Sequence, residues 1–157
     1  MIYVNPDNFL GSPRVFTDER NREAWRLCKE LVERTLAEAR ELTNFYIVCG
    51  VQGSGKTWWV KNNLPYFVEP AIVFDAALPL AEVRARVVSH ARRYSCRFVS
   101  VWISCELDVA LAQNSARPSD EIVPEEVVRL VFNEFEPPTL DEGFEEVLKV
   151  ENQTGFR

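Results

Sequence analysis

The chain has 157 residues, of which 46% are hydrophobic and 27% are charged, and its formal net charge is −6. This length suits one compact domain, no apolar run approaches the roughly 18 residues of a membrane span, and the N-terminus lacks a basic-then-apolar secretion signal. We therefore expect a cytoplasmic protein without a membrane partner, and its acidity argues against a general attraction to nucleic acid.

The first third of the chain predicts a short strand followed by a long helix. Residues 2–4 are apolar and lead into the polar turn 5–8. Thr17 or Asp18 can cap a helix that continues to about Arg40. Apolar residues recur at helical spacing along it, namely Trp25, Cys28, Val32, Leu36 and Ala39. A second strand is predicted over residues 45–49, followed by a helix from Lys56 that ends before Pro65.

The rest of the chain continues to alternate strands and helices. We expect strands over 71–74, 98–103 and 145–150, and helices over 106–114 and 124–135, with a polar loop between those helices. A further helix follows residue 79, with an apolar stripe of Leu80, Val83, Val87, Ala91 and Tyr94. The arginines at 84, 86, 92, 93 and 97 should occupy its solvated side. The pattern predicts an α/β three-layer sandwich with a mostly parallel sheet.

Cysteine and histidine give little sign of metal chemistry. The four cysteines (Cys28, Cys49, Cys96 and Cys105) show no C-x-x-C spacing, and His90 is the sole histidine. A zinc site is therefore not expected. We interpret the cysteines as buried, reduced thiols.

The clearest motif is the glycine-rich stretch Gly50-x-x-x-x-Gly55-Lys56-Thr57, which lies between a predicted strand and a predicted helix. Backbone N–H groups of such a loop surround phosphate oxygens, and the following helix adds its positive dipole end. The expected nucleotide-binding residues are Gly50, Val51, Gln52, Gly53, Ser54, Gly55, Lys56 and Thr57. Lys56 should reach the β and γ phosphates of ATP, and the Thr57 hydroxyl should bind Mg²⁺.

A second oxygen ligand for Mg²⁺ is expected at the end of a neighbouring strand. Asp75 ends the apolar run 72–74 and is placed for this role, although a carboxylate there could instead cap a turn. Phosphoryl transfer also requires a group that takes the proton of the attacking hydroxyl. Asp7 is the candidate because it follows the first strand, although residues 5–8 could equally form only a turn.

An arginine in a mobile segment commonly stabilises the charge of the transferring phosphoryl group. Arg117 lies in the one polar loop that could fold over the site, whereas Arg129 lies within a predicted helix and suits the surface. The catalytic candidates are therefore Asp7, Lys56 and Arg117.

The C-terminal third resembles the polynucleotide kinase branch of small P-loop kinases, which includes 5′-hydroxyl kinases, RNA-repair kinases and zeta toxins. Residues 112–117 (AQNSAR) are similar to the family's R-N-x-x-R lid, and residues 123–128 (VPEEVV) to its V-P-E-x-V-I helix. Residues 135–144 (FEPPTLDEGF) are similar to its F-E-x-P-x-x-E-G-F ending. The resemblance implies a P-loop NTPase kinase fold.

The segment order differs from the family's. Family members run from the P-loop to a strand with S-x-D-x-F and only later to a strand that ends in Asp. Here residues 4–9 (VNPDNF) resemble the S-x-D-x-F strand, and residues 15–20 with Ala24 and Trp25 resemble the stretch after it, yet both precede the P-loop. Residues 73–76 resemble the D-A-T-N-L strand end. We interpret the chain as a rearranged, circular-permutation-like version of that core.

The resemblance assigns the same roles as the residues themselves: Lys56 and Thr57 to phosphate and Mg²⁺, Asp75 to the metal, Asp7 as general base and Arg117 as lid arginine. Leu10 stands where the family usually places an arginine that grips the substrate, Gln113 replaces the first lid arginine and Ala77 departs from D-A-T-N-L. Arg14 could supply the missing grip.

One domain is expected over residues 1–157. It comprises the base-bearing strand and helix (1–44), the P-loop core (45–111), the lid with its following helix (112–135) and a C-terminal segment (136–157). The predicted activity is transfer of the ATP γ-phosphate to a nucleic-acid 5′-hydroxyl end or a nucleotide-like small molecule. The alternatives are an ATP-binding switch without transfer activity and a zeta toxin-like sugar-nucleotide kinase.

Overall fold

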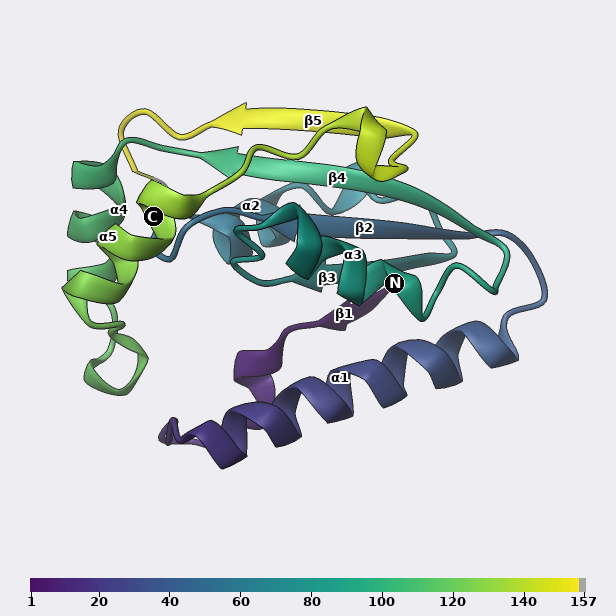
Figure 1. Cartoon of the computed structure of the whole chain (residues 1–157), viewed down its shortest axis with the longest axis horizontal. Helices are drawn as coiled ribbons and strands as arrows, with labels where there is room; N and C mark the ends of the chain where they lie inside the picture. The colour runs from purple at the N-terminus through teal and green to yellow at the C-terminus, as the bar shows by residue number, and fades with distance from the viewer. Residues whose placement is uncertain (156–157) are drawn as a thin grey trace.

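A computed structural model describes residues 1–155 as a parallel sheet with helices on both faces (Figure 1). The five strands are β1 (Ile2–Val4), β2 (Thr43–Cys49), β3 (Ala71–Asp75), β4 (Cys96–Ser104) and β5 (Glu146–Glu151). Their order across the sheet is β1-β3-β2-β4-β5, and every pairing is parallel. The α/β three-layer prediction is confirmed, and the strand predicted over residues 2–4 pairs with β3 in the sheet.

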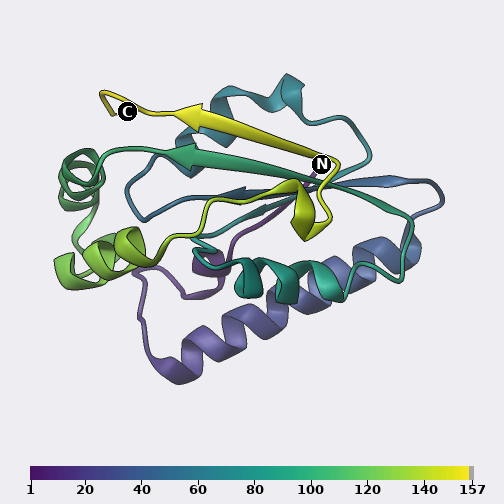
Figure 2. The same ribbon diagram turned by 45° about the horizontal axis from the view of Figure 1, so that its top comes forward.

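Helices cover the sheet unequally on its two faces. The helices are α1 (Asp18–Glu38), α2 (Lys56–Asn62), α3 (Ala81–Ser89), α4 (Leu107–Ser115) and α5 (Glu125–Glu134). Helices α1 and α3 lie on one face and α2 lies on the other (Figure 2). Helices α4 and α5 lie beyond the carboxyl ends of the strands (Figure 1). Loops at that edge therefore come together from all parts of the chain.

The two cores follow the alternation of side chains along β2, which is buried along its whole length. Phe45 and Ile47 join the cluster beneath α1 and α3, while Tyr46 and Val48 join the one beneath α2. Neighbouring residues of a strand point to opposite faces, so a strand covered on both sides is apolar throughout. The apolar run before the glycine loop is thus the central strand of the sheet.

Two expectations for α3, the helix after β3, are wrong. The helix ends at Ser89, so Ala91 is buried in a turn and not in a helical stripe. Arg84, expected on the solvated side, is 1% exposed. Its guanidinium donates to both carboxylate oxygens of Glu142, at 2.7 and 3.0 Å, and to the Leu78 carbonyl. The side opposite an apolar stripe is buried here because the 3₁₀ turn Leu140–Glu142 packs over it.

The prediction of buried cysteines is confirmed for two of the four. Cys28 and Cys49 are buried, whereas Cys96 and Cys105 are partly exposed, and all four are unpaired. Burial raises the pKa of the Cys49 thiol to about 11, so it stays protonated near neutral pH. Within residues 1–155, no helix is both long enough and apolar enough to cross a membrane.

Candidate phosphate-transfer site

The glycine loop connects β2 to α2 at the carboxyl edge of the sheet. Gly53 has a φ of +83° and Gly55, which begins α2, has a φ of +96°. A Cβ on Gly53 would lie 2.1 Å from the Ala110 carbonyl oxygen, so the loop lies directly against α4. Both positions need glycine, the first for close approach and both for the left-handed backbone.

Lys56 is folded back over this loop. Its ammonium is buried and donates to the carbonyl oxygens of Gly50, at 2.9 Å, and Val51, at 3.1 Å. Burial lowers the pKa of Lys56, while the Asp75 carboxylate acts in the opposite direction. A buried cation with only neutral partners is poised to exchange them for an anion.

Asp75 is the centre of a buried polar network. Its Oδ2 accepts from the Thr57 hydroxyl at 2.8 Å and from the Tyr3 hydroxyl at 2.5 Å. The Asn5 amide in turn donates to the Tyr3 oxygen at 3.1 Å. Asp75 is 1% exposed, and its Oδ1 has no hydrogen-bond partner among residues 1–155. The network joins β1, β3 and the start of α2.

These oxygens fit a divalent cation. Hydroxyl and carboxylate oxygens are the hard donors that Mg²⁺ takes, usually in small number and together with waters. The unpartnered Oδ1 of Asp75 is a buried acceptor whose desolvation a cation would compensate. Thr57 and Asp75, both predicted as metal ligands, contact each other directly, so the fold brings the two together.

Asp7 follows β1, in the 3₁₀ turn Pro6–Phe9, at the same edge of the sheet. Its backbone N–H donates to the Asn5 side chain at 2.9 Å, as a simple turn requires, but its carboxylate is half exposed. Burial lowers the pKa of both Lys56 and Arg117, and the Asp7 carboxylate acts in the opposite direction on each. Its charge therefore acts on the phosphate loop and on the lid segment at once.

Arg117 lies just after α4, in the loop that leads to α5. It is half-buried, and burial lowers its pKa, whereas the Asp7 charge raises it. Within residues 1–155 its guanidinium has neither a hydrogen bond nor an ion pair. The structure thus places Asp7, Lys56, Asp75 and Arg117 in segments that meet at the carboxyl edge of the sheet.

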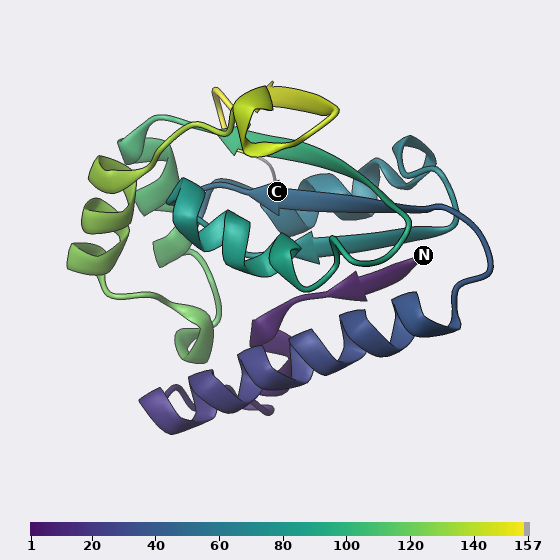
Figure 3. The same ribbon diagram turned by 45° about the vertical axis from the view of Figure 1, so that its right-hand side comes forward.

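Arg14 connects the opening segment to the lid loop. Its guanidinium lies 3.4 Å from Asp7 and 3.7 Å from Glu121, and the backbone N–H of Arg14 donates to the Asp120 carboxylate at 2.8 Å. Figure 3 shows the lid loop reaching the segment after β1. Leu10, where the resembled family has an arginine, is buried, so Arg14 is the cation placed beside Asp7.

Three contributors to the site were missed from the sequence. The Tyr3 hydroxyl binds Asp75, Gln113 donates to the Gly53 carbonyl, and the buried Asn152 donates to the Ser54 carbonyl at 2.8 Å. Tyr3 carried a signal as a polar aromatic residue in a short strand beside a candidate site, and Gln113 carried one through its position in the lid motif, although its contact with Gly53 was not anticipated. The other two contacts depend on how α4 and the end of β5 meet the phosphate loop.

Comparisons with known proteins give one weak structural similarity. No family model matches the chain, and no curated protein matches it. A solved structure to which the chain is similar is a gluconokinase from Sinorhizobium meliloti 1021, with a TM-score of 0.45 and 13% identity. The similarity covers 69% of this chain and 82% of that one. By its own sheet order and glycine loop, the chain is a parallel α/β sandwich with a glycine-rich loop between its central strand and α2.

Proposed function

We propose that this protein is an ATP-dependent phosphotransferase in which Asp7 activates an acceptor hydroxyl. The observations that carry the proposal are Lys56 folded over the glycine loop, the direct contact of Thr57 with Asp75, and Arg14, which ties Asp7 to the loop that bears Arg117. Lys56 and Arg117 have no anionic hydrogen-bond partner within residues 1–155. A nucleotide-binding site without transfer would need the loop and Lys56 but gains nothing from Asp7.

The roles follow from charge and position. Loop N–H groups and Lys56 would hold the triphosphate, and Arg117 would neutralise charge on the transferring group. The acceptor oxygen forms a bond to the γ-phosphorus while the bond from that phosphorus to the β,γ-bridging oxygen breaks. The acceptor proton passes to the Asp7 carboxylate, and ADP leaves with the bridging oxygen.

Thr57 and Asp75 would hold Mg²⁺. The ion supplies neutralisation of phosphate charge when bound. Tyr3 is a positioning residue in this scheme because its hydroxyl engages Oδ2 of Asp75 and leaves Oδ1 available.

The acceptor that we propose is a nucleic-acid 5′-hydroxyl end or a nucleotide-like small molecule, as in the polynucleotide kinase branch. Support comes from the motifs that this chain shares with the branch and from Arg14, which lies beside Asp7. A cation at 3.4 Å from the base can contact a phosphate next to the attacking hydroxyl. A sugar nucleotide, the acceptor in zeta toxin-like kinases, also carries phosphates and remains the second candidate.

The test is transfer from γ-labelled ATP with Mg²⁺ to a panel of 5′-hydroxyl oligonucleotides, nucleosides and sugar nucleotides, read as label and as a mass gain of one phosphate group. Asp7→Asn should lower transfer about a hundredfold or more, the usual contribution of a general base, without weakening ATP binding. The matched control is Asp18→Asn, an exposed acid nearby in sequence that should leave the rate unchanged.

Other outcomes identify other functions. Label released only to water, at a rate that Asp7→Asn does not change, would indicate a nucleotide-dependent switch. Phosphate found only on sugar nucleotides would assign the toxin-like branch. A failure to bind ATP at all would refute the nucleotide site itself.

A further inference from the structure

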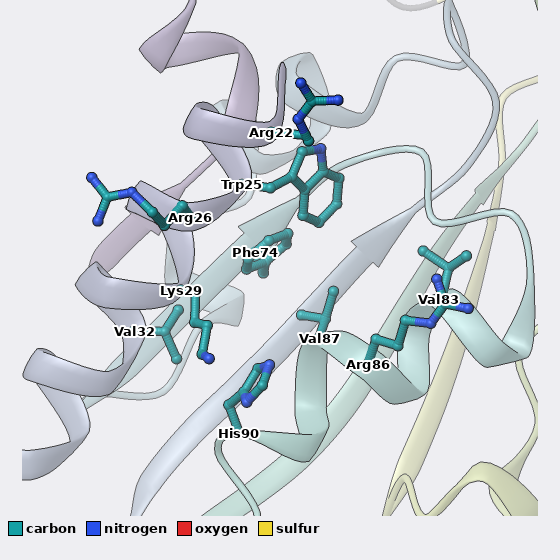
Figure 4. A pocket seen from close by; sticks show the side chains of 10 residues that line it. All are labelled: Arg22, Trp25, Arg26, Lys29, Val32, Phe74, Val83, Arg86, Val87 and His90. Carbon is teal, nitrogen blue, oxygen red and sulfur yellow. The ribbon is translucent and has the colours of Figure 1, made fainter. Parts of the chain in front are cut away.

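A groove of about 520 Å³ lies between α1 and α3, on the sheet face opposite α2 (Figure 4). Its apolar lining consists of Trp25, Val32, Phe74, Val83 and Val87. None of the lining residues belongs to the phosphate loop or to the lid loop. The groove is therefore a feature separate from the transfer site, and the proposed function makes no use of it.

The polar lining of this groove carries one sign of charge. It consists of Arg22, Arg26, Lys29, Arg86 and His90, without a carboxylate. Arg26 and Arg86 are paired with glutamates of their own helices, but Arg22 and Lys29 form no ion pair within residues 1–155. The chain as a whole has a net charge of −6, so a basic groove stands out from the rest of the molecule.

The apolar lining favours aliphatic groups over stacked bases. Val83 and Val87 are only half-buried and form one wall. Phe74 is 3% exposed, and its ring lies 5.7 Å from that of Trp25, which leaves Trp25 as the accessible ring of this pair. Single-stranded nucleic acid is held by several aromatic platforms in succession. This groove offers one accessible aromatic ring on α1, the His90 imidazole at the end of α3 and an aliphatic wall.

The dimensions suit a helix. The groove follows α1 from Arg22 to Val32, a distance of about 15 Å at the helical rise, or roughly three turns. It lies between two helices and above a sheet, and Figure 4 shows basic side chains on both of its sides. An amphipathic helix binds such a groove with its apolar stripe inward and its charged flanks outward.

We propose that the α1–α3 groove binds an acidic amphipathic helix of a partner protein. Aliphatic side chains of the helix contact Trp25, Val83 and Val87, and its carboxylates pair with Arg22 and Lys29. The basic lining requires acidic side chains on the partner, and the aliphatic wall favours a protein helix over nucleic acid.

The probe is a displayed library of helical peptides of about 16 residues, which are about 24 Å long and span the groove. Selection against the wild-type protein should enrich aliphatic residues at i, i+3, i+4 and i+7 together with flanking Asp and Glu. The affinity of the best peptide, measured by fluorescence anisotropy, should fall at least tenfold for Arg22→Glu with Lys29→Glu. The control Arg34→Glu reverses an exposed charge elsewhere on α1 and should leave the affinity unchanged.

Equal thermal midpoints of the two variants show that the fold is intact. The proposal is overturned if no sequence is enriched, if enriched peptides bind the reversed variant equally, or if scrambling the best peptide leaves its affinity unchanged. A single-stranded oligonucleotide that binds with the same dependence on Arg22 and Lys29 assigns the groove to nucleic acid instead. Self-association of the wild type, lost in the reversed variant, assigns it to a second copy. Transfer activity is independent of all of these outcomes.

Discussion

Tyr3 shows how a single side chain couples the first strand to Asp75, the carboxylate proposed to bind Mg²⁺. Its hydroxyl shares Oδ2 of Asp75 with Thr57, and burial raises the pKa of the phenol far above its usual range, so it remains a donor. Tyr3→Phe removes one hydrogen bond to a charged acceptor, which contributes about 1.5–3 kcal/mol. We expect the Mg²⁺ concentration for half-maximal ATP binding to rise about tenfold, measured by calorimetric titration.

Tyr94→Phe is the control for this change, because Tyr94 is also half-buried. Its ring contacts the guanidinium of Arg93 and not Thr57 or Asp75, the proposed Mg²⁺ ligands. Its Mg²⁺ dependence should equal that of the wild type. If Tyr3→Phe also leaves the Mg²⁺ dependence unchanged, Asp75 does not need the phenol for its orientation.

We expect Lys56 to make the free energy of unfolding depend on pH. Burial lowers its pKa in the folded state, so over the range between the lowered and the ordinary value the unfolded chain binds more protons than the folded one. Stability should therefore rise as pH increases through the lowered pKa toward the usual lysine value near 10.4. Raised cysteine and tyrosine pKa values act in the opposite direction, so the comparison must isolate Lys56.

The measurement is urea unfolding of the wild type and of Lys56→Met without nucleotide, from about pH 7 to about pH 10. The free energy of unfolding should increase more with pH, or decrease less, in the wild type than in the variant. Saturating ATP should remove this difference, because phosphate oxygens stabilise the charged lysine. Parallel pH curves without ATP would contradict a buried ammonium.

At the scale of elements, the contact between the phosphate loop and α4 depends on Gly53. Gly53→Ala would place a Cβ 2.1 Å from the Ala110 carbonyl in a left-handed backbone, so the loop must move away from α4. We expect a loss of roughly 2 kcal/mol or more in unfolding free energy and of most ATP affinity. Urea unfolding and ATP titration measure the two effects.

Gly11→Ala is the matched control, because Gly11 also has a positive φ, +92°, but an added Cβ meets nothing closer than 3.5 Å. It shares the backbone strain of about 1–2 kcal/mol without the clash. Equal losses in the two variants would show that strain alone, and not the packing against α4, accounts for the Gly53 effect.

The lid loop and the opening segment are joined through Arg14, which contacts Asp7, Asp120 and Glu121. These pairs are partly exposed, so Arg14→Ala should cost less than about 1 kcal/mol of global stability. Hydrogen exchange of residues 116–123 should nevertheless become faster, because the loop loses the side-chain pair of Glu121 with Arg14 and keeps only the bond from the residue 14 backbone N–H to Asp120. The control is Arg129→Ala, which breaks an exposed pair with Glu125 within α5 and should leave exchange of the loop unchanged.

At the scale of the whole molecule, the proposed kinship with the polynucleotide kinase branch requires an exchange of segments and not a cyclic permutation. A cyclic permutation that began at the strand before Asp7 would place the glycine-loop strand last. Here that strand is second in the chain and central in the sheet, while β1 is outermost beside β3. Parallel pairing brings every carboxyl end to one edge whatever the chain order, so Asp7 and Asp75 still lie at the same edge.

The sequence predicted the parts of this molecule that local patterns determine. The strand before the glycine loop, the helix after it and the long α1 follow from apolar spacing and from the Thr17 cap, whose hydroxyl accepts from Arg20 N–H at 3.1 Å. The direct contact of Thr57 with Asp75 follows from strand order and could be anticipated.

What depends on contacts between distant segments could not be predicted. Arg84 is buried only because the turn Leu140–Glu142 covers it. The side chain of Asn152, near the C-terminus, donates to the Ser54 carbonyl of the glycine loop. The groove between α1 and α3 is likewise a result of how two helices are spaced on the sheet, which their separate apolar stripes do not determine.

The most direct measurement of the central claim is a crystal structure with MgADP, aluminium fluoride as a mimic of the transferring phosphoryl group, and the acceptor found by transfer. We expect Lys56 to leave the carbonyls of Gly50 and Val51 for the phosphates, and Arg117 to contact the fluoride. The Asp7 carboxylate should lie within about 3.2 Å of the acceptor oxygen. A structure in which Asp7 stays on Arg14, away from a bound acceptor and under a closed lid, would contradict the account.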